Sequence, residues 1–215
     1  MNRKISKLFS LEGKVACITG ASNGLGQEVA STLVENGARV IGIARNKNLL
    51  ESWSQKTGSN SAYIASDLSE RNNINKVTTE ISEFFGPPDI LINAAGVNTR
   101  EHANDVTFDN WDKTIELNLA APFFIAQALV PNMKRKGWGR IVNFASLQSR
   151  RAFPSGLSYG ASKGGVIALS KVLSIELSPY NITVNTLCPG AIETELVKKM
   201  HDKETRRAFL QKIGR

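Results

Sequence analysis

Three side chains in the second half of the sequence have types and spacing suited to proton transfer. Ser146 follows an apolar run, and Tyr159 and Lys163 lie four residues apart in a segment with helical character. Residues at this spacing share one face of a helix, so the phenol and the ammonium are predicted to lie together. A free phenol has a pKa of about 10, and a nearby ammonium favours its ionised form. Taken alone, the same spacing is also common in surface pairs.

A glycine-rich turn near the start of the chain has the composition of a phosphate-binding loop. Thr19-Gly20-Ala21-Ser22-Asn23-Gly24-Leu25-Gly26 follows an apolar run and precedes an amphipathic segment containing Val29, Leu33 and Val34. Glycine permits close backbone approach, and free amides at a helix start attract pyrophosphate. The turn predicts dinucleotide binding, and a merely tight connection is the alternative. The candidate contacts are Gly20, Ser22, Asn23, Gly24, Leu25 and Gly26.

Further candidates for dinucleotide contacts follow the next three apolar runs. Arg45 stands where many dinucleotide-binding proteins have a carboxylate, and a guanidinium there favours the 2′-phosphate of NADP(H) over NAD(H). A surface arginine is the alternative. Two short segments are predicted to adjoin the adenosine, although each could simply end a strand. They are Asp67 with Leu68, and the small-residue turn that contains Asn93, Ala94 and Gly96.

These motifs must be positioned by strands that alternate with helices. Six β-rich runs are separated by helix-length segments, which predicts an α/β fold with a doubly wound parallel sheet in a single domain. In such a sheet, ligands bind beyond the carboxyl ends of the strands, where all of the candidate residues fall. The predicted strands span 15–19, 39–44, 61–65, 89–93, 139–145 and 182–187.

Composition excludes several other classes of protein. Hydrophobic residues make up 41% and charged residues 21% of the 215 residues, which is typical of a globular domain. No apolar run approaches the ~20 residues of a membrane span. The net charge of +8 would also suit nucleic acid, but Lys134-Arg135-Lys136 is explained as the end of a helix. Cys17 and Cys188 are expected to be buried and reduced, and no metal site is predicted.

The ordered set of motifs resembles the short-chain dehydrogenase/reductase family. The matching residues are Thr19–Gly26, Asn93–Gly96, Asn118, Ser146, Tyr159, Lys163 and Pro189-Gly190. Ala94 departs from the asparagine that many members have. The resemblance implies a Rossmann fold and hydride transfer between a nicotinamide and a carbonyl or alcohol carbon. Tyr159 would then exchange the proton, and Ser146 would hold the substrate oxygen.

The resemblance also assigns the remaining positions. Lys163 would bias Tyr159, together with the positive charge of the oxidised nicotinamide, and would bind the nicotinamide ribose. Asn118, at an expected helix kink, would anchor a water between Lys163 and solvent. Pro189, Gly190, Ile192 and Thr194 would lie beside the nicotinamide and pyrophosphate. A substrate lid is expected within 191–212. Relatives usually continue with another helix and a seventh strand, which are expected to be missing here.

The opening residues Leu8-Phe9-Ser10-Leu11-Glu12-Gly13-Lys14-Val15 and the Gly24-Leu25-Gly26 turn resemble those of sugar-acid or polyol dehydrogenases such as gluconate 5-dehydrogenase, which implies a sugar acid or polyol as the substrate. A 3-oxoacyl-carrier-protein reductase is the alternative. A non-catalytic NADP-binding regulator is the alternative of another class. The expected protein is cytoplasmic, acts on a small molecule and forms a homodimer or homotetramer. No nucleic acid or membrane partner is expected.

Overall fold

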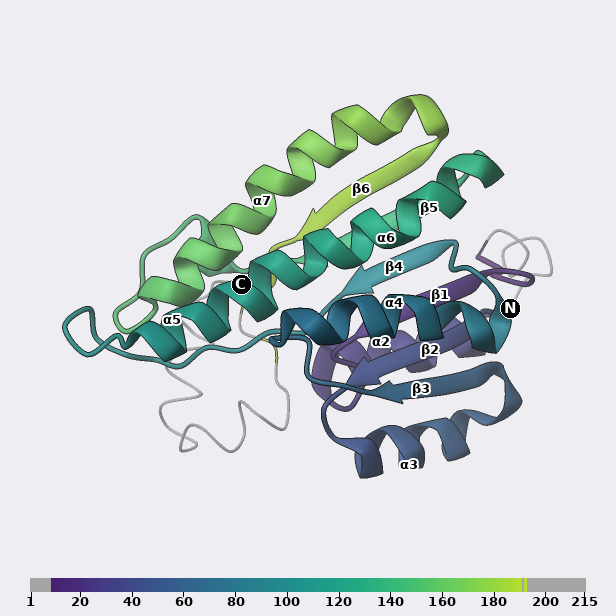
Figure 1. Cartoon of the computed structure of the whole chain (residues 1–215), viewed down its shortest axis with the longest axis horizontal. Coiled ribbons are helices and arrows are strands. Elements are labelled where there is room, and N and C mark those ends of the chain that lie inside the picture. Colours follow the sequence, from purple (N-terminus) through teal and green to yellow (C-terminus); the bar gives the residue numbers. More distant parts are fainter. Residues whose placement is uncertain (1–8, 191, 193–215) are drawn as a thin grey trace.

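Six parallel strands form the centre of the computed structural model, which describes residues 9–190 and 192. The strand order is β3-β2-β1-β4-β5-β6, so the chain reverses direction across the sheet between β1 and β4 (Figure 1). This reversal is the point at which doubly wound sheets bind their ligands. The strands are β1 (Val15–Thr19), β2 (Arg39–Ala44), β3 (Ser61–Ala65), β4 (Ile90–Asn93), β5 (Gly139–Phe144) and β6 (Ile182–Leu187).

Helices cover both faces of the sheet because its central strands are apolar on both sides. Side chains of α4, α6 and α7 pack with Leu91 and Ile141 in one buried cluster. Those of α2 and α3 pack with Ile18 and Val40 in a second cluster. The helices are α2 (Gly24–Glu35), α3 (Lys47–Thr57), α4 (Arg71–Phe85), α5 (Phe108–Ile115), α6 (Ala121–Lys136) and α7 (Leu157–Leu177).

The architecture confirms the predicted fold class. Four of the six strands have the predicted bounds, and the other two are one residue shorter. The buried thiol predicted at Cys188 is wrong: Cys17 is buried, but Cys188 is exposed. The reason is that Cys188 comes directly after β6, the outermost strand in the described part of the sheet, where the last residue, Leu187, is itself 48% exposed. Except for Ile192, the predicted lid at 191–212 lies outside the described residues.

One helical run is long and apolar enough to cross a membrane by length and composition alone. It spans Phe108–Lys136 and comprises α5, a π-helical turn at Glu116–Ala120, and α6. Ile125, Leu129 and Met133 of α6 are at most 2% exposed and pack in the same cluster as strand residues Leu91 and Ile141. The run is therefore a core helix of the fold.

Candidate functional site

The sheet brings the three proton-transfer candidates to one edge. Ser146 lies two residues beyond β5, and Tyr159 and Lys163 lie in the first two turns of α7. The loop after β6 joins them, because the amide of Leu147 donates to the carbonyl of Pro189 at 3.0 Å. The carboxyl ends of β5 and β6 and the start of α7 thus form one wall of the site.

Reciprocal hydrogen bonds hold Ser146 in place. Its hydroxyl accepts the amide hydrogen of Gln148 at 3.1 Å, while its own amide donates to Ser149 Oγ at 3.2 Å. This capping box starts the short 3₁₀ helix Leu147–Ser149. Since one lone pair of the hydroxyl is used by Gln148, the hydroxyl hydrogen remains to be donated elsewhere. The Ser146 hydroxyl also lies close enough to Tyr159 to lower the pKa of that phenol.

Burial dominates the ionisation of Tyr159 and Lys163. It raises the pKa of Tyr159 above its ordinary value, and the hydrogen bond with Ser146 lowers it by less. Burial also lowers the pKa of Lys163 to about 8. Lys163 Nζ lies 5.8 Å from the centroid of the Tyr159 ring and donates to the carbonyl of Phe144 at 2.6 Å. A lowered phenol pKa therefore stays a prediction for the complex with oxidised cofactor, in which the nicotinamide adds a second positive charge.

Asn118, where a helix kink was expected, lies in the π-helical turn Glu116–Ala120. Pro122 has no N–H group, so the carbonyl of Asn118 lacks its usual α-helical donor four residues later, which accounts for the wider turn. The Asn118 side chain accepts the amide hydrogen of Val97 at 2.8 Å and donates to the carbonyl of Val97 at 2.9 Å. It thereby fixes the chain that follows Gly96.

Ser162 is a site residue that the sequence did not single out. Its hydroxyl accepts from Asn118 Nδ2 at 3.1 Å and donates to the carbonyl of Tyr159 at 2.7 Å. It is completely buried. Its position directly before Lys163, in a run of small residues, was the only available signal.

The glycine-rich turn has the shape that a pyrophosphate requires. Gly20 has a φ of +77°, and a Cβ there would lie 2.8 Å from the backbone nitrogen of Ala95. A Cβ on Gly26 would lie 2.3 Å from the carbonyl oxygen of Gly20. Asn23, which precedes α2, makes no side-chain capping bond, and no acidic residue lies in the first turn of the helix. The free amides and the positive end of the helix dipole therefore fit an anionic cofactor.

Arg45 and Asp67 meet at the ends of β2 and β3. Arg45 Nη1 lies 3.7 Å from Asp67 Oδ2, and the Arg45 side chain is 58% exposed. Burial of Asp67 raises its pKa, but hydrogen bonds from Ser69 and the charges of Arg45 and Lys113 together bring the pKa below its ordinary value. Asp67 is therefore ionised at neutral pH and available to accept hydrogen bonds.

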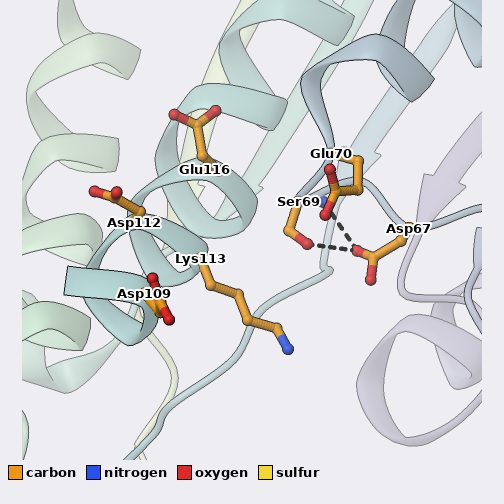
Figure 2. A pocket seen from close by; sticks show the side chains of 7 residues that line it. All are labelled: Asp67, Ser69, Glu70, Asp109, Asp112, Lys113 and Glu116. Carbon is orange, nitrogen blue, oxygen red and sulfur yellow. Dashed lines mark hydrogen bonds between the residues drawn. The ribbon is translucent and has the colours of Figure 1, made fainter. Parts of the chain in front are cut away.

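An acidic hollow of about 330 Å³ opens beside Asp67. Figure 2 shows Lys113 extending from α5 into the space between α5 and Asp67. The preponderance of carboxylates disfavours a phosphate within this hollow. The lining residues are Asp67, Ser69, Glu70, Asp109, Asp112, Lys113 and Glu116.

Several predicted cofactor residues have side chains that point into the protein. Leu68 is 3% exposed and belongs to the core, and Asn93 is 3% exposed and hydrogen-bonded within the sheet. Only their backbone atoms can face a ligand. Gly96 is different, because a Cβ there would lie 3.3 Å from Asn118 Oδ1 and 3.4 Å from Lys163 Nζ. Gly190 and Ile192 are exposed, and Thr194 lies outside the described residues.

Across residues 9–190 and 192, no group of three or more His, Cys, Asp or Glu residues is arranged to hold a metal ion.

Comparison with known proteins gives consistent matches. Residues 14–205 match the model of the short chain dehydrogenase family. An NAD-dependent glycerol dehydrogenase of Listeria innocua is 39% identical over 90% of this chain and 76% of the enzyme. The 3-oxoacyl-[acyl-carrier-protein] reductase FabG of Vibrio cholerae is 35% identical over 95% of this chain and 84% of the enzyme.

A solved structure has the same fold. It is a protein of Beutenbergia cavernae assigned as an NAD(P)-dependent gluconate 5-dehydrogenase, with NADP bound. It is 29% identical and superposes with a TM-score of 0.84 over 93% of this chain and 81% of that chain. The chain therefore belongs to the short chain dehydrogenase family and is an NAD(P)-dependent oxidoreductase that acts on CH–OH groups.

Proposed function

We propose that the protein is a cytoplasmic enzyme that interconverts a ketone and a secondary alcohol on a sugar acid or polyol, with NADP(H) as its cofactor. The observation that carries the proposal is the placement of Ser146 just beyond β5, with Tyr159 and the buried Lys163 together on α7, at the edge of the sheet that carries the glycine-rich turn. A bound NADP(H) supplies or accepts the hydride. Gly20, the amide groups at the start of α2, and Gly96 would hold it.

In the proposed reaction, side chains of this protein bind the substrate oxygen and transfer one proton to or from it. Ser146 donates its free hydroxyl hydrogen to the substrate oxygen. Tyr159 gives its phenolic proton to that oxygen during reduction and accepts it during oxidation. We infer that Lys163 replaces this proton, and the Asn118 carbonyl would hold a water that connects Lys163 to solvent. The hydroxyl groups of Ser146 and Tyr159 must both stay within reach of one substrate oxygen. The hydrogen bonds around Ser146, Asn118 and Ser162 restrict the movement of this part of the site.

The proposed preference for NADP(H) rests on Arg45. Its guanidinium is largely exposed at the end of β2, and its contact with Asp67 is long. An exposed ion pair of this kind contributes about 0–1 kcal/mol, so Arg45 can turn to a phosphate at little cost. The relatives do not share one preference, because the Listeria enzyme is NAD-dependent and the Beutenbergia structure holds NADP.

Replacing Arg45 by alanine tests this preference. We expect the R45A variant to bind NADPH about 10- to 100-fold more weakly, because one charge-assisted phosphate contact contributes about 1.5–3 kcal/mol. Its affinity for NADH should change less than about threefold, since NADH lacks the 2′-phosphate. Titration of cofactor fluorescence measures both dissociation constants. Equal weakening for the two cofactors would contradict the assignment.

The substrate class is tested by a panel of carbonyl compounds. Keto acids derived from gluconate, dihydroxyacetone and an acetoacetyl thioester would be offered with NADPH and with NADH, and oxidation followed at the nicotinamide absorbance. Fastest turnover of a keto sugar acid or ketose supports the proposal. Fastest turnover of the thioester would favour the alternative, a 3-oxoacyl-carrier-protein reductase. Tight NADPH binding without turnover of any carbonyl would favour the second alternative, a non-catalytic regulator.

The proposed assembly is a homodimer, with a homotetramer as the larger alternative. Val172 and Ile175 on the outer side of α7 are 54% and 76% exposed, and such apolar side chains favour a contact with a second copy. A charge at Ile175 should therefore separate the subunits. We expect I175E to shift the light-scattering mass to that of a monomer, whereas E176Q on the same helix should leave it unchanged. An unchanged mass for I175E would place the interface elsewhere.

A further inference from the structure

A row of buried polar side chains crosses the sheet directly beneath the site. Thr19, Asn93 and Asn143 occupy adjoining register positions on β1, β4 and β5. They are only 2%, 3% and 1% exposed. Buried polar groups cost free energy unless they are hydrogen-bonded, so such a row needs compensating bonds in a sheet whose neighbouring positions are apolar.

The hydrogen bonds of this row join the cofactor turns to the catalytic helix. At one end, Thr19 Oγ1 accepts the amide hydrogen of Ala95 at 3.1 Å. In the middle, Asn93 Nδ2 donates to Asn143 Oδ1 at 2.8 Å. At the other end, Asn143 Nδ2 donates to Ser170 Oγ at 2.9 Å, and Ser170 donates to the Val166 carbonyl at 2.7 Å.

Asn143 is the only member of the row whose side chain bonds both to β4, through Asn93, and to α7, through Ser170. Ser170 lies seven residues after Lys163, about two turns further along α7. Asn93 lies three residues before Gly96, whose Cβ position is only 3.4 Å from Lys163 Nζ. A slip of α7 along β5 would therefore alter the position of Lys163 and Tyr159 relative to the turn at Gly96.

In the part of the chain that the structure describes, the Asn93 side chain has no other short hydrogen bond that could replace the one to Asn143. Its other donor contact is a long one to the Pro122 carbonyl at 3.4 Å, and within the described residues its Oδ1 has no partner. Loss of Asn143 would leave Asn93 with only this long contact on β4, and would remove the donor to the Ser170 hydroxyl on α7. The arrangement thus resists any change in the relative position of the two elements.

We propose that Asn143 is a positioning residue of the reaction, one that holds the catalytic helix in register with the cofactor turn. The proposal rests on the proposed function, because it takes Tyr159 and Lys163 as the acting groups. Asn143 touches neither substrate nor cofactor and acts only through Ser170 and Asn93. It should therefore influence the rate of the chemical step more than cofactor affinity, since small misplacements of reacting groups cost rate.

The test compares N143L and S170A with D89L. Asp89 is a buried, hydrogen-bonded residue at the opposite end of the sheet, where it accepts from Val15 N at 3.0 Å and from Lys136 Nζ at 2.7 Å. The kcat with the best substrate of the panel, the NADPH dissociation constant and the thermal midpoint would be measured for each. S170A removes only the two bonds of the Ser170 hydroxyl and keeps the test available if N143L does not fold.

We expect N143L and S170A to lower kcat at least about tenfold and the NADPH affinity less than threefold. The double variant should be no slower than the slower single variant, because both changes break one chain of bonds. D89L should lower the thermal midpoint while keeping kcat. Wild-type kcat in N143L and S170A, or an equal loss in D89L, would overturn the proposal.

A second readout separates this proposal from the proposed function. The pH at which Tyr159 ionises in the NADP⁺ complex can be followed by tyrosinate absorbance, with no substrate present. We expect this pH to rise in N143L and S170A and not in D89L. If the wild type binds NADP⁺ but reduces no carbonyl, the proposed function fails while this measurement still decides the role of Asn143.

Discussion

Replacement of Tyr159 by phenylalanine should abolish turnover while leaving cofactor binding intact. The change removes one hydroxyl, which is the proton donor of the proposed reaction and lies close enough to Ser146 for its pKa to be lowered by that residue. A positioned general acid contributes about 10²–10⁴ in rate, so we expect kcat to fall by about 10³-fold or more. The NADPH dissociation constant should stay within about twofold, because the aromatic ring is retained.

The matched control is Y180F, which removes the same atom from an exposed tyrosine just beyond α7. It should leave kcat unchanged. Both rates would be measured at saturating NADPH and over a range of pH. Turnover in Y159F above one tenth of the wild-type value would show that another group donates the proton.

Replacement of Lys163 by methionine should separate activity from stability. Activity should fall at least about 100-fold, because the amine that replaces the phenolic proton is lost. The free energy of unfolding should hold or rise at neutral pH. Burial lowers the pKa of Lys163 to about 8, which means that the folded protein carries a charged amine there at a cost in free energy.

The pH dependence of this cost has a definite sign. Below pH 8, Lys163 is protonated in both the folded and the unfolded chain, and the cost is at its full value. Between about 8 and the ordinary lysine value of 10.5, the unfolded chain binds more protons than the folded one, so this group makes the wild type relatively more stable as pH rises.

The difference in unfolding free energy between K163M and wild type should therefore move in favour of wild type between pH 8 and pH 10. Denaturant titrations at several pH values measure it, with K171M, on the same helix, as the control. A flat difference would mean that Lys163 is not desolvated as described.

The fold was largely predictable because hydrophobic periodicity decides it. The run Ile90-Leu91-Ile92 was expected to be a strand covered on both faces, and the structure buries all three residues. The gathering of Ser146, Tyr159 and Lys163 also followed, because residues at the carboxyl ends of parallel strands meet at one edge. The family resemblance implied an irregular helix at Asn118, and a π-helical turn lies there.

Other features depended on three-dimensional contacts that no local pattern carries. The bond of Lys163 to the Phe144 carbonyl and the rise in the pKa of Tyr159 come from burial, which the spacing of the two residues does not specify. The exposure of Cys188 depends on which strand is outermost rather than on the residues beside it. The polar row through Asn143 joins positions 50 residues apart on neighbouring strands, and it is visible only once the register is known.

The π-helical turn at Glu116–Ala120 also bears on how this helix can change over evolution. Such a turn holds one residue more than an α-helix of the same length, so the residues after it are rotated by roughly 100° about the axis. The rotation lets one continuous helix direct Asn118 to Val97 and Ile125 to the sheet. Deletion of one residue in this stretch would restore α-helical spacing and would rotate Ile125 and the rest of α6 relative to Asn118 without altering any strand. The length of this turn therefore sets which residues of one helix face the site and which face the core.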